Sequence, residues 1–175
     1  TTASNNTALG YRALYENTTG FSNVAVGMGA LRRNNIRSNL VAVGDSALFN
    51  NAAGLGPLTG ELPPPTGYYN TAVGSKALFA NIAGYSCSAF GSEALRNSLG
   101  AYNTGVGTIA LRNNTTGGYN TSVGASALAN NTTGAGNTAV GTFALQLTTG
   151  NGEYNAALGY DAGGLLTTAR YNTAI

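Results

Sequence analysis

The chain has 175 residues, of which 8% are charged, and its eight basic and six acidic side chains leave a net charge of +2. This charge is too small and too scattered to predict binding to nucleic acid or to an anionic membrane. The sequence contains no histidine, which excludes a histidine general base, a Ser-His-Asp triad and a histidine metal site. It also lacks an apolar run of ~18 residues that could span a membrane. We therefore expect no enzyme activity, no cofactor, no metal and no membrane insertion.

Close copies of one unit of about 17 residues run from one end of the chain to the other. A glycine after an apolar residue anchors each copy, and these glycines are Gly10, Gly27, Gly44, Gly74, Gly91, Gly107, Gly124, Gly141 and Gly159. A period this short and regular predicts a solenoid of stacked coils rather than a globule around one core. We expect an all-β β-solenoid or β-roll of about ten 17-residue coils, with residues 1–175 forming a single array. The first and last residues resemble parts of interrupted copies, so we expect the chain to be a segment of a longer array.

The columns of the repeat predict what each position does. An alanine stands three residues after the glycine in all nine copies, a leucine follows it in eight, and the residue before the glycine is always apolar. We expect these columns to form the core. Four residues before the glycine, eight of ten copies carry asparagine, which predicts a ladder of side-chain amides that bond the coils above and below. Cys87 stands in this asparagine column and is interpreted as a small polar replacement.

Near the N-terminus, Arg32, Arg33 and Arg37 form the one basic cluster. We interpret them as a solvated turn in preference to an anion site.

The large interruption of the repeat lies at residues 54–69, where 13 extra residues include all four prolines. Proline lacks the backbone donor that a ladder needs, so the segment must leave the coil as a loop. Insertions in repeat proteins often carry binding, and the alternative is an inert or subunit-bridging loop. The candidate contact residues are Leu58, Glu61, Pro63, Pro64, Pro65, Tyr68 and Tyr69.

The segment after each glycine, as in residues 92–97, places alanine and leucine side by side. Strict strand alternation would send these two side chains to opposite faces. We therefore expect either a short helical turn or a bent second strand, stabilised by stacking.

Each copy begins with an extended piece, as in residues 137–141. Alternation would place Thr138 and Val140 on one side and Ala139 on the other. We expect the valine side to face the coil interior. The alanine column would then form an outward stripe, and we favour its use for close packing against other chains over an exposed stripe without a partner.

The Asn-Thr-Ala-Val-Gly-x-x-Ala-Leu-x-x-Asn-Thr-Thr-Gly pattern resembles repeats of bacteriophage tail-fibre and related surface-fibre proteins. More distantly, it is similar to the heads of trimeric autotransporter adhesins. The resemblance implies a homotrimer of stacked coils, extracellular, on a cell surface or on a virion, that serves as a rod, spacer or receptor-binding head. A cell-surface receptor or a glycan would then be the partner.

The leading hypothesis is a non-catalytic structural and adhesive fibre segment. The alternatives are a subunit of a head-to-tail extracellular filament, a polysaccharide-cleaving tailspike and an ice-binding solenoid. Ice binding would use the threonine column (Thr7, Thr71, Thr104, Thr121, Thr138 and Thr173), which we expect to turn inward beside valine.

Overall fold

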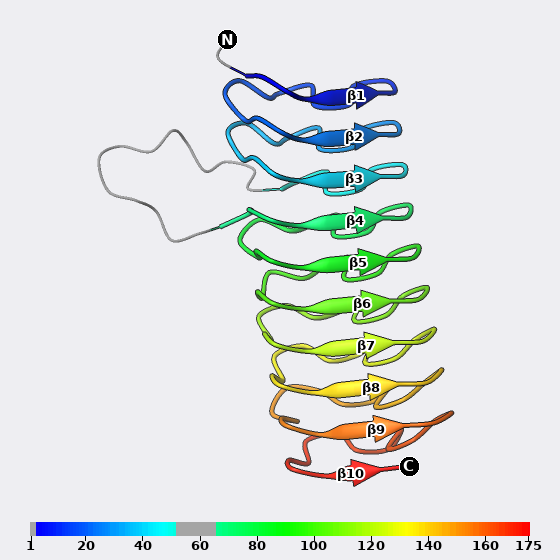
Figure 1. Cartoon of the computed structure of the whole chain (residues 1–175). Coiled ribbons are helices and arrows are strands. Elements are labelled where there is room, and N and C mark those ends of the chain that lie inside the picture. Colours follow the sequence, from blue (N-terminus) through cyan, green and yellow to red (C-terminus); the bar gives the residue numbers. More distant parts are fainter. Residues whose placement is uncertain (1–2, 52–65) are drawn as a thin grey trace, which may run out of the picture.

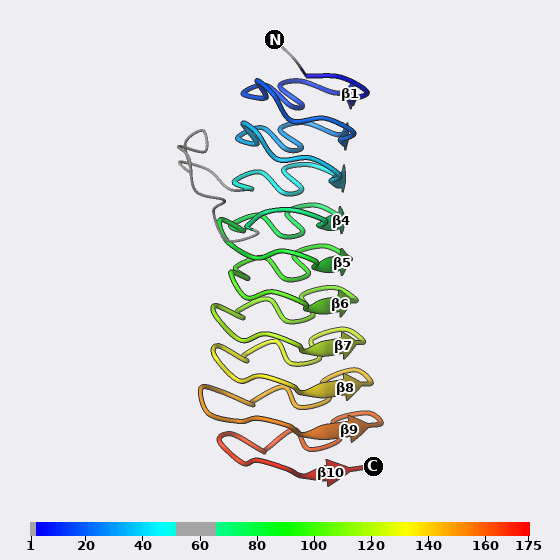
Figure 2. The same ribbon diagram turned by 60° about the vertical axis from the view of Figure 1, so that its left-hand side comes forward.

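The computed structural model describes residues 3–51 and 66–175 as a stack of coils, each with one short strand on the same side of the stack (Figures 1 and 2). The strands are β1 (Thr7–Leu9), β2 (Val24–Val26), β3 (Val41–Val43), β4 (Thr71–Val73), β5 (Ser88–Phe90), β6 (Thr104–Val106), β7 (Thr121–Val123), β8 (Thr138–Val140), β9 (Ala156–Leu158) and β10 (Thr173–Ala174). They form one parallel sheet in chain order. The predicted all-β solenoid is therefore confirmed.

Every strand pairs with the corresponding residues of the next coil, as Thr121 does with Thr138. The register continues across the interruption, where Val41 of β3 pairs with Thr71 of β4. The 13 extra residues therefore leave the sheet and its repeat undisturbed.

The alanine column faces the coil interior, which corrects the expected orientation of the strands. The middle residue of β2 to β9 is buried, and Ala25, Ala42, Ala72, Ala89 and Ala139 are fully buried. The threonine and valine columns both point outward instead. The physical reason is the size of the interior. A Cβ built on Gly105, in the alanine column, would lie 3.2 Å from Cγ of Leu95, so the leucine column leaves room for nothing larger than a small side chain opposite it.

The segment after each glycine is neither a helix nor a strand. The eight leucines of its column all have positive φ, between 49° and 52°, and the residues two positions earlier also have positive φ. Since the alanine between them does not, the backbone alternates in handedness and turns instead of extending. Both Ala127 and Leu128 can therefore be buried. The left-handed backbone conformation of Leu128 costs free energy, which is offset because its backbone N–H donates to the carbonyl of Ala144 in the next coil at 3.0 Å.

The asparagine ladder is confirmed, and its hydrogen bonds close each coil as well as join it to its neighbours. Asn120 accepts at Oδ1 from the backbone N–H and the Nδ2 amide of Asn137, at 2.9 and 3.2 Å. Its own Nδ2 donates to the carbonyl of Gly134, at 2.9 Å, at the far corner of the same coil. The hydrogen bonds of each buried amide within the protein thus replace the hydrogen bonds to water that it loses on burial.

A second asparagine ladder, not predicted from the sequence, runs along the Asn-Thr-Thr-Gly corners. Nδ2 of Asn131 donates to Oδ1 of Asn114 at 3.0 Å and to the carbonyl of Gly134 at 2.9 Å. The corner carbonyl of Gly134 therefore accepts one amide from each ladder. In the next coil the column changes to Thr148, which donates to Leu166 instead, and Oδ1 of Asn131 is left buried without a partner.

The interpretation of Cys87 as a small polar replacement for asparagine in the first ladder is confirmed. Its backbone N–H donates to Oδ1 of Asn70 at 3.0 Å, and Sγ donates to the carbonyl of Gly100 at 3.3 Å, where an asparagine would place its amide. Burial of this side chain raises the pKa of the thiol to about 11.

We expect Cys87 to be inert in the folded protein. Raising the pKa from 9.0 to about 11 makes the reactive thiolate about 100-fold rarer at pH 8. Labelling with a disulfide reagent at pH 8 should therefore be at least about 100-fold slower in buffer than in denaturant. Equal rates would contradict the burial of Sγ.

The raised pKa of Cys87 also predicts how stability depends on pH. Because the folded thiol keeps its proton to higher pH than the unfolded thiol, its contribution to the free energy of unfolding should be unchanged below pH ~9 and fall from there toward pH ~11. The Cys87→Ser variant should lack this component of the pH dependence.

Candidate interaction face

The outward side of the sheet carries two columns of side chains that no other part of the described chain covers. We call this surface the sheet face and define it by the first and third positions of each strand. The third positions are Leu9, Val26, Val43, Val73, Phe90, Val106, Val123, Val140, Leu158 and Ile175, which are half-buried or exposed. The first positions are Thr7, Val24, Val41, Thr71, Ser88, Thr104, Thr121, Thr138, Ala156 and Thr173. An apolar column this long and this exposed is unusual for a surface that meets only water.

The sheet face contains no charged residue over its whole length. The charges of the described chain lie instead on the turn segments and at the corners. Two ion pairs occur among the described residues, between Arg112 and Glu93 at 3.2 Å and between Arg170 and Glu153 at 3.5 Å. Because charged side chains are the groups most costly to remove from water, their absence makes the sheet face suited to burial against another surface.

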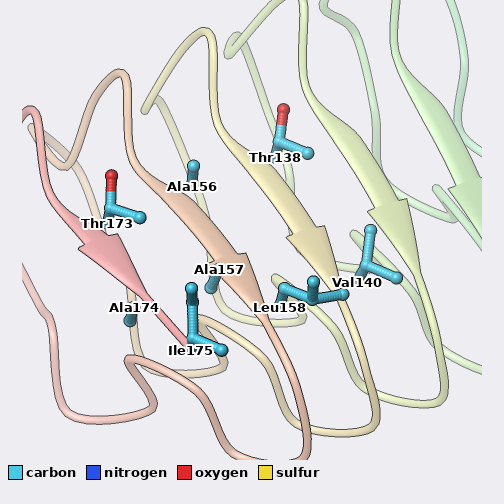
Figure 3. Close-up of a pocket in the computed structure, with 8 residues that line it drawn as sticks. All are labelled: Thr138, Val140, Ala156, Ala157, Leu158, Thr173, Ala174 and Ile175. Atoms are coloured by element: carbon cyan, nitrogen blue, oxygen red, sulfur yellow. The ribbon is translucent and has the colours of Figure 1, made fainter.

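The sheet face is uneven because the size of its side chains varies from coil to coil. Phe90 is 42% exposed where most copies have valine, so its ring projects above its neighbours. Ala156 interrupts the threonine column between Thr138 and Thr173, and Figure 3 shows these three side chains on the outward side while Ala157 points the other way. The missing bulk leaves an apolar hollow of about 340 Å³ beside Leu158. Projections and hollows of this kind are features of surfaces that pack against other surfaces.

A column that borders the sheet face, two residues before each strand, carries tyrosine in five of the ten coils. Its tyrosines, exposed by 44% to 76%, are Tyr69, Tyr102, Tyr119, Tyr154 and Tyr171. Rings of neighbouring coils stack, with centroids 4.9 Å apart for Tyr102 and Tyr119 and 5.3 Å apart for Tyr154 and Tyr171. The tyrosine column extends the uncharged surface to the corner of the coil.

Of the seven predicted contact residues, two belong to the described part of the chain, Tyr68 and Tyr69. Tyr69 is 63% exposed and belongs to the tyrosine column. Tyr68 is half-buried, and its hydroxyl accepts from Nη1 of Arg37 at 3.2 Å. The other five, Leu58, Glu61, Pro63, Pro64 and Pro65, lie outside the described residues.

The interpretation of the basic cluster as a solvated turn is wrong for Arg37. This side chain is 1% exposed, with its guanidinium 4.9 Å from the centroid of the Tyr68 ring. Its Nη2 donates to Oγ1 of Thr66 at 3.3 Å. Arg37, at the corner of the second coil, thus contacts the residues that follow the interruption, while Arg33 is exposed and Arg32 is half-buried.

Comparisons of the chain with protein-family models, curated proteins and solved structures gave no match. A separate search of the described residues for a long apolar helix that could cross a membrane also found none.

Proposed function

We propose that the chain is a structural and adhesive segment of an extracellular or virion fibre, in which copies of the chain associate as a homotrimer through the sheet face. The observation that supports this proposal most is the uncharged sheet face with its exposed apolar column. It replaces the alanine stripe as the candidate interface, since that stripe is buried inside the coil. Threefold symmetry and the location come from the resemblance to fibre repeats, and the non-catalytic role rests on the lack of histidine in the sequence.

The dimensions of the sheet face are sufficient for a specific interface. Ten coils at ~4.8 Å and strands with flanks of about 13 Å give a flat area on the order of 600 Å². Side-chain relief increases the accessible area above this value, toward the ~800 Å² per partner that stable complexes bury. Burial of the exposed apolar column would supply the driving force, at roughly 25 cal/mol per Å² before the entropy of association is subtracted.

A charge in the middle of the sheet face should prevent association. We expect wild-type protein at micromolar concentration to have three times the 17.6 kDa mass of the chain in light scattering. Val123→Asp should give a monomer, because the carboxylate would be buried without a partner. The matched control is Ala125→Asp, in the same coil, at an exposed position of a column that already contains Asp45. It should leave the trimer intact.

The same measurement separates the competing hypotheses. A wild-type monomer, or Val123→Asp trimers as stable as wild type, would contradict association through the sheet face. Masses that grow with concentration without reaching a limit would indicate a head-to-tail filament in place of a closed fibre.

Ice binding is a second candidate, because the threonine column faces outward and not inward as expected. Thr104, Thr121 and Thr138 form a regular outward series with the valines beside them. The projecting Phe90 and the hollow at Ala156 interrupt the flat surface on either side of this series. Ice binding also needs the sheet face open to water, so a trimer that buries this face would exclude it.

A further inference from the structure

A second hollow, away from the sheet face, lies on the turn segments of the first three coils. Its volume is about 130 Å³, and its walls include Tyr11, Arg12, Met28, Arg32 and Phe49. The inference drawn from it does not depend on the proposed fibre role.

The hollow exists because one coil lacks a side chain that all other coils have. Gly29 stands two residues after the coil glycine, and its Cβ position would lie 3.2 Å from the ring of Phe49. The other residues of this column are Arg12, Ser46, Lys76, Glu93, Ile109, Ser126, Phe143 and Asp161. Gly29 is therefore the one member of the column without a side chain, and the ring of Phe49 in the next coil lies close to where its Cβ would be.

Two guanidinium groups line the hollow, and neither has an acidic partner among the described residues. The guanidinium carbon of Arg12 lies 5.1 Å from the centroid of Tyr11, and that of Arg32 lies 5.3 Å from the centroid of Phe49. Nε of Arg32 is buried without a hydrogen-bond partner. The two ion pairs of the described chain involve other arginines.

The first three coils carry a net positive charge, although Asp45 lies beside the hollow and accepts from Oγ of its lining residue Ser46 at 3.1 Å. Residues 1–51 contain four arginines against Glu16 and Asp45, whereas the basic and acidic residues after residue 51 are equal in number. The whole net charge of +2 therefore belongs to the first three coils. A donor-rich hollow in a region of positive charge favours an anionic ligand.

We propose that this hollow binds an organic carboxylate whose carbon frame is no larger than a six-membered ring. Guanidinium groups recognise carboxylates through paired, charge-assisted hydrogen bonds, and both Arg12 and Arg32 line the hollow. Tyr11, Met28 and Phe49 supply apolar walls for the carbon frame. The volume is close to the ~150 Å³ of a cavity that holds benzene. A free organic acid and a terminal uronic acid of a saccharide share this chemistry.

The test is a titration of the full chain, followed by NMR and calorimetry, with benzoate, D-glucuronate, inorganic phosphate and neutral D-glucose. At least one of the two carboxylates should bind saturably in the millimolar range and shift the amide signal of Gly29. Tighter binding of glucuronate would identify a saccharide acid as the ligand class, and tighter binding of benzoate would identify a free organic acid. Glucose should not bind.

Variants locate the site. Arg32→Gln should weaken binding at least tenfold, and Gly29→Ile should abolish it by filling the hollow with the side chain that Ile109 places in the same column. The matched control is Arg96→Gln, because Arg96 stands in the column of Arg32 and its guanidinium lies 5.8 Å from the centroid of Phe79. It should bind like wild type.

Four results would overturn the proposal: no saturable carboxylate binding to wild type, unchanged binding to a folded Gly29→Ile protein, equal loss in Arg32→Gln and Arg96→Gln, or phosphate binding as tight as that of the carboxylates. The second and third would indicate general attraction of anions to a basic surface. If Gly29→Ile does not fold, the comparison of the two arginine variants decides alone.

Discussion

Replacing Gly124 by alanine is expected to destabilise the protein by about 3–5 kcal/mol. Gly124 has φ of 131°, and a Cβ at this position would lie 2.5 Å from the carbonyl oxygen of Gly141 in the next coil. Both obstacles involve backbone, because an L side chain disfavours the dihedral angle and the Gly141 carbonyl is held by the backbone N–H of Ala144, which donates to it at 3.2 Å. All nine glycines of this column have φ between 127° and 136°, and all but Gly159 would place a Cβ within 2.6 Å of the carbonyl oxygen of the next coil.

The matched control for Gly124→Ala is Gly118→Ala. The column of Gly118 already contains Ala101 and Ala135, its φ is not positive, and the nearest atom to its Cβ position is the carbonyl oxygen of Ala101 at 3.1 Å. We expect a change within about 1 kcal/mol in urea unfolding monitored by circular dichroism. Equal effects of the two substitutions would show that the close contact between coils does not explain the glycine column.

Replacing Asn120 by alanine is expected to cost a similar amount, about 3–5 kcal/mol, through loss of hydrogen bonds and not through a steric clash. The substitution removes the acceptor of the Asn137 backbone N–H and amide, and it removes the donors to Asn103 and Gly134. Groups left buried without partners cost more than the net value of the bonds they lose. The measurement is the free energy of unfolding in urea, compared with that of wild type.

Asn130→Ala is the control for Asn120→Ala. Asn130 is half-buried on the outside of the coil, its side chain accepts one bond from Asn113 at 3.3 Å, and the column already contains Ala80. A change below about 1 kcal/mol is expected. If the two asparagine variants were equally stable, the buried ladder could not be a main source of cohesion between coils.

The repeat made most of the architecture predictable. The regular glycines predicted one coil per unit and stacking in register, and the asparagine column predicted the first amide ladder. Both follow from repetition alone, because identical residues on successive coils must lie next to each other. Asn-Thr-Thr-Gly is also a common turn sequence, so its asparagines do not by themselves indicate a ladder, and the second ladder was not predicted.

The orientation of the strands could not be predicted from hydrophobicity. Valine is larger and more apolar than alanine, so burying the valine column was the simpler choice. The leucine column fills the interior from the opposite side, so only small residues such as alanine, Gly105 and Ser122 fit in the strand column that faces it. Phe90 did indicate the correct orientation, because an aromatic ring in an otherwise aliphatic column suits an open surface better than a narrow interior.

The hollow at Gly29 could not be predicted from the sequence either. Its glycine is one of 26, and its two arginines belong to different columns of the repeat. Only the left-handed turns bring these columns to the same surface.

The most direct test of association through the sheet face is maleimide labelling of single cysteines placed at positions 123 and 125 in a Cys87→Ser background. The two positions lie in the same coil, on and off the sheet face. The account predicts that the cysteine at position 123 becomes protected as concentration rises into the micromolar range, while the cysteine at position 125 stays reactive. Equal reactivity of both positions at every concentration would contradict it.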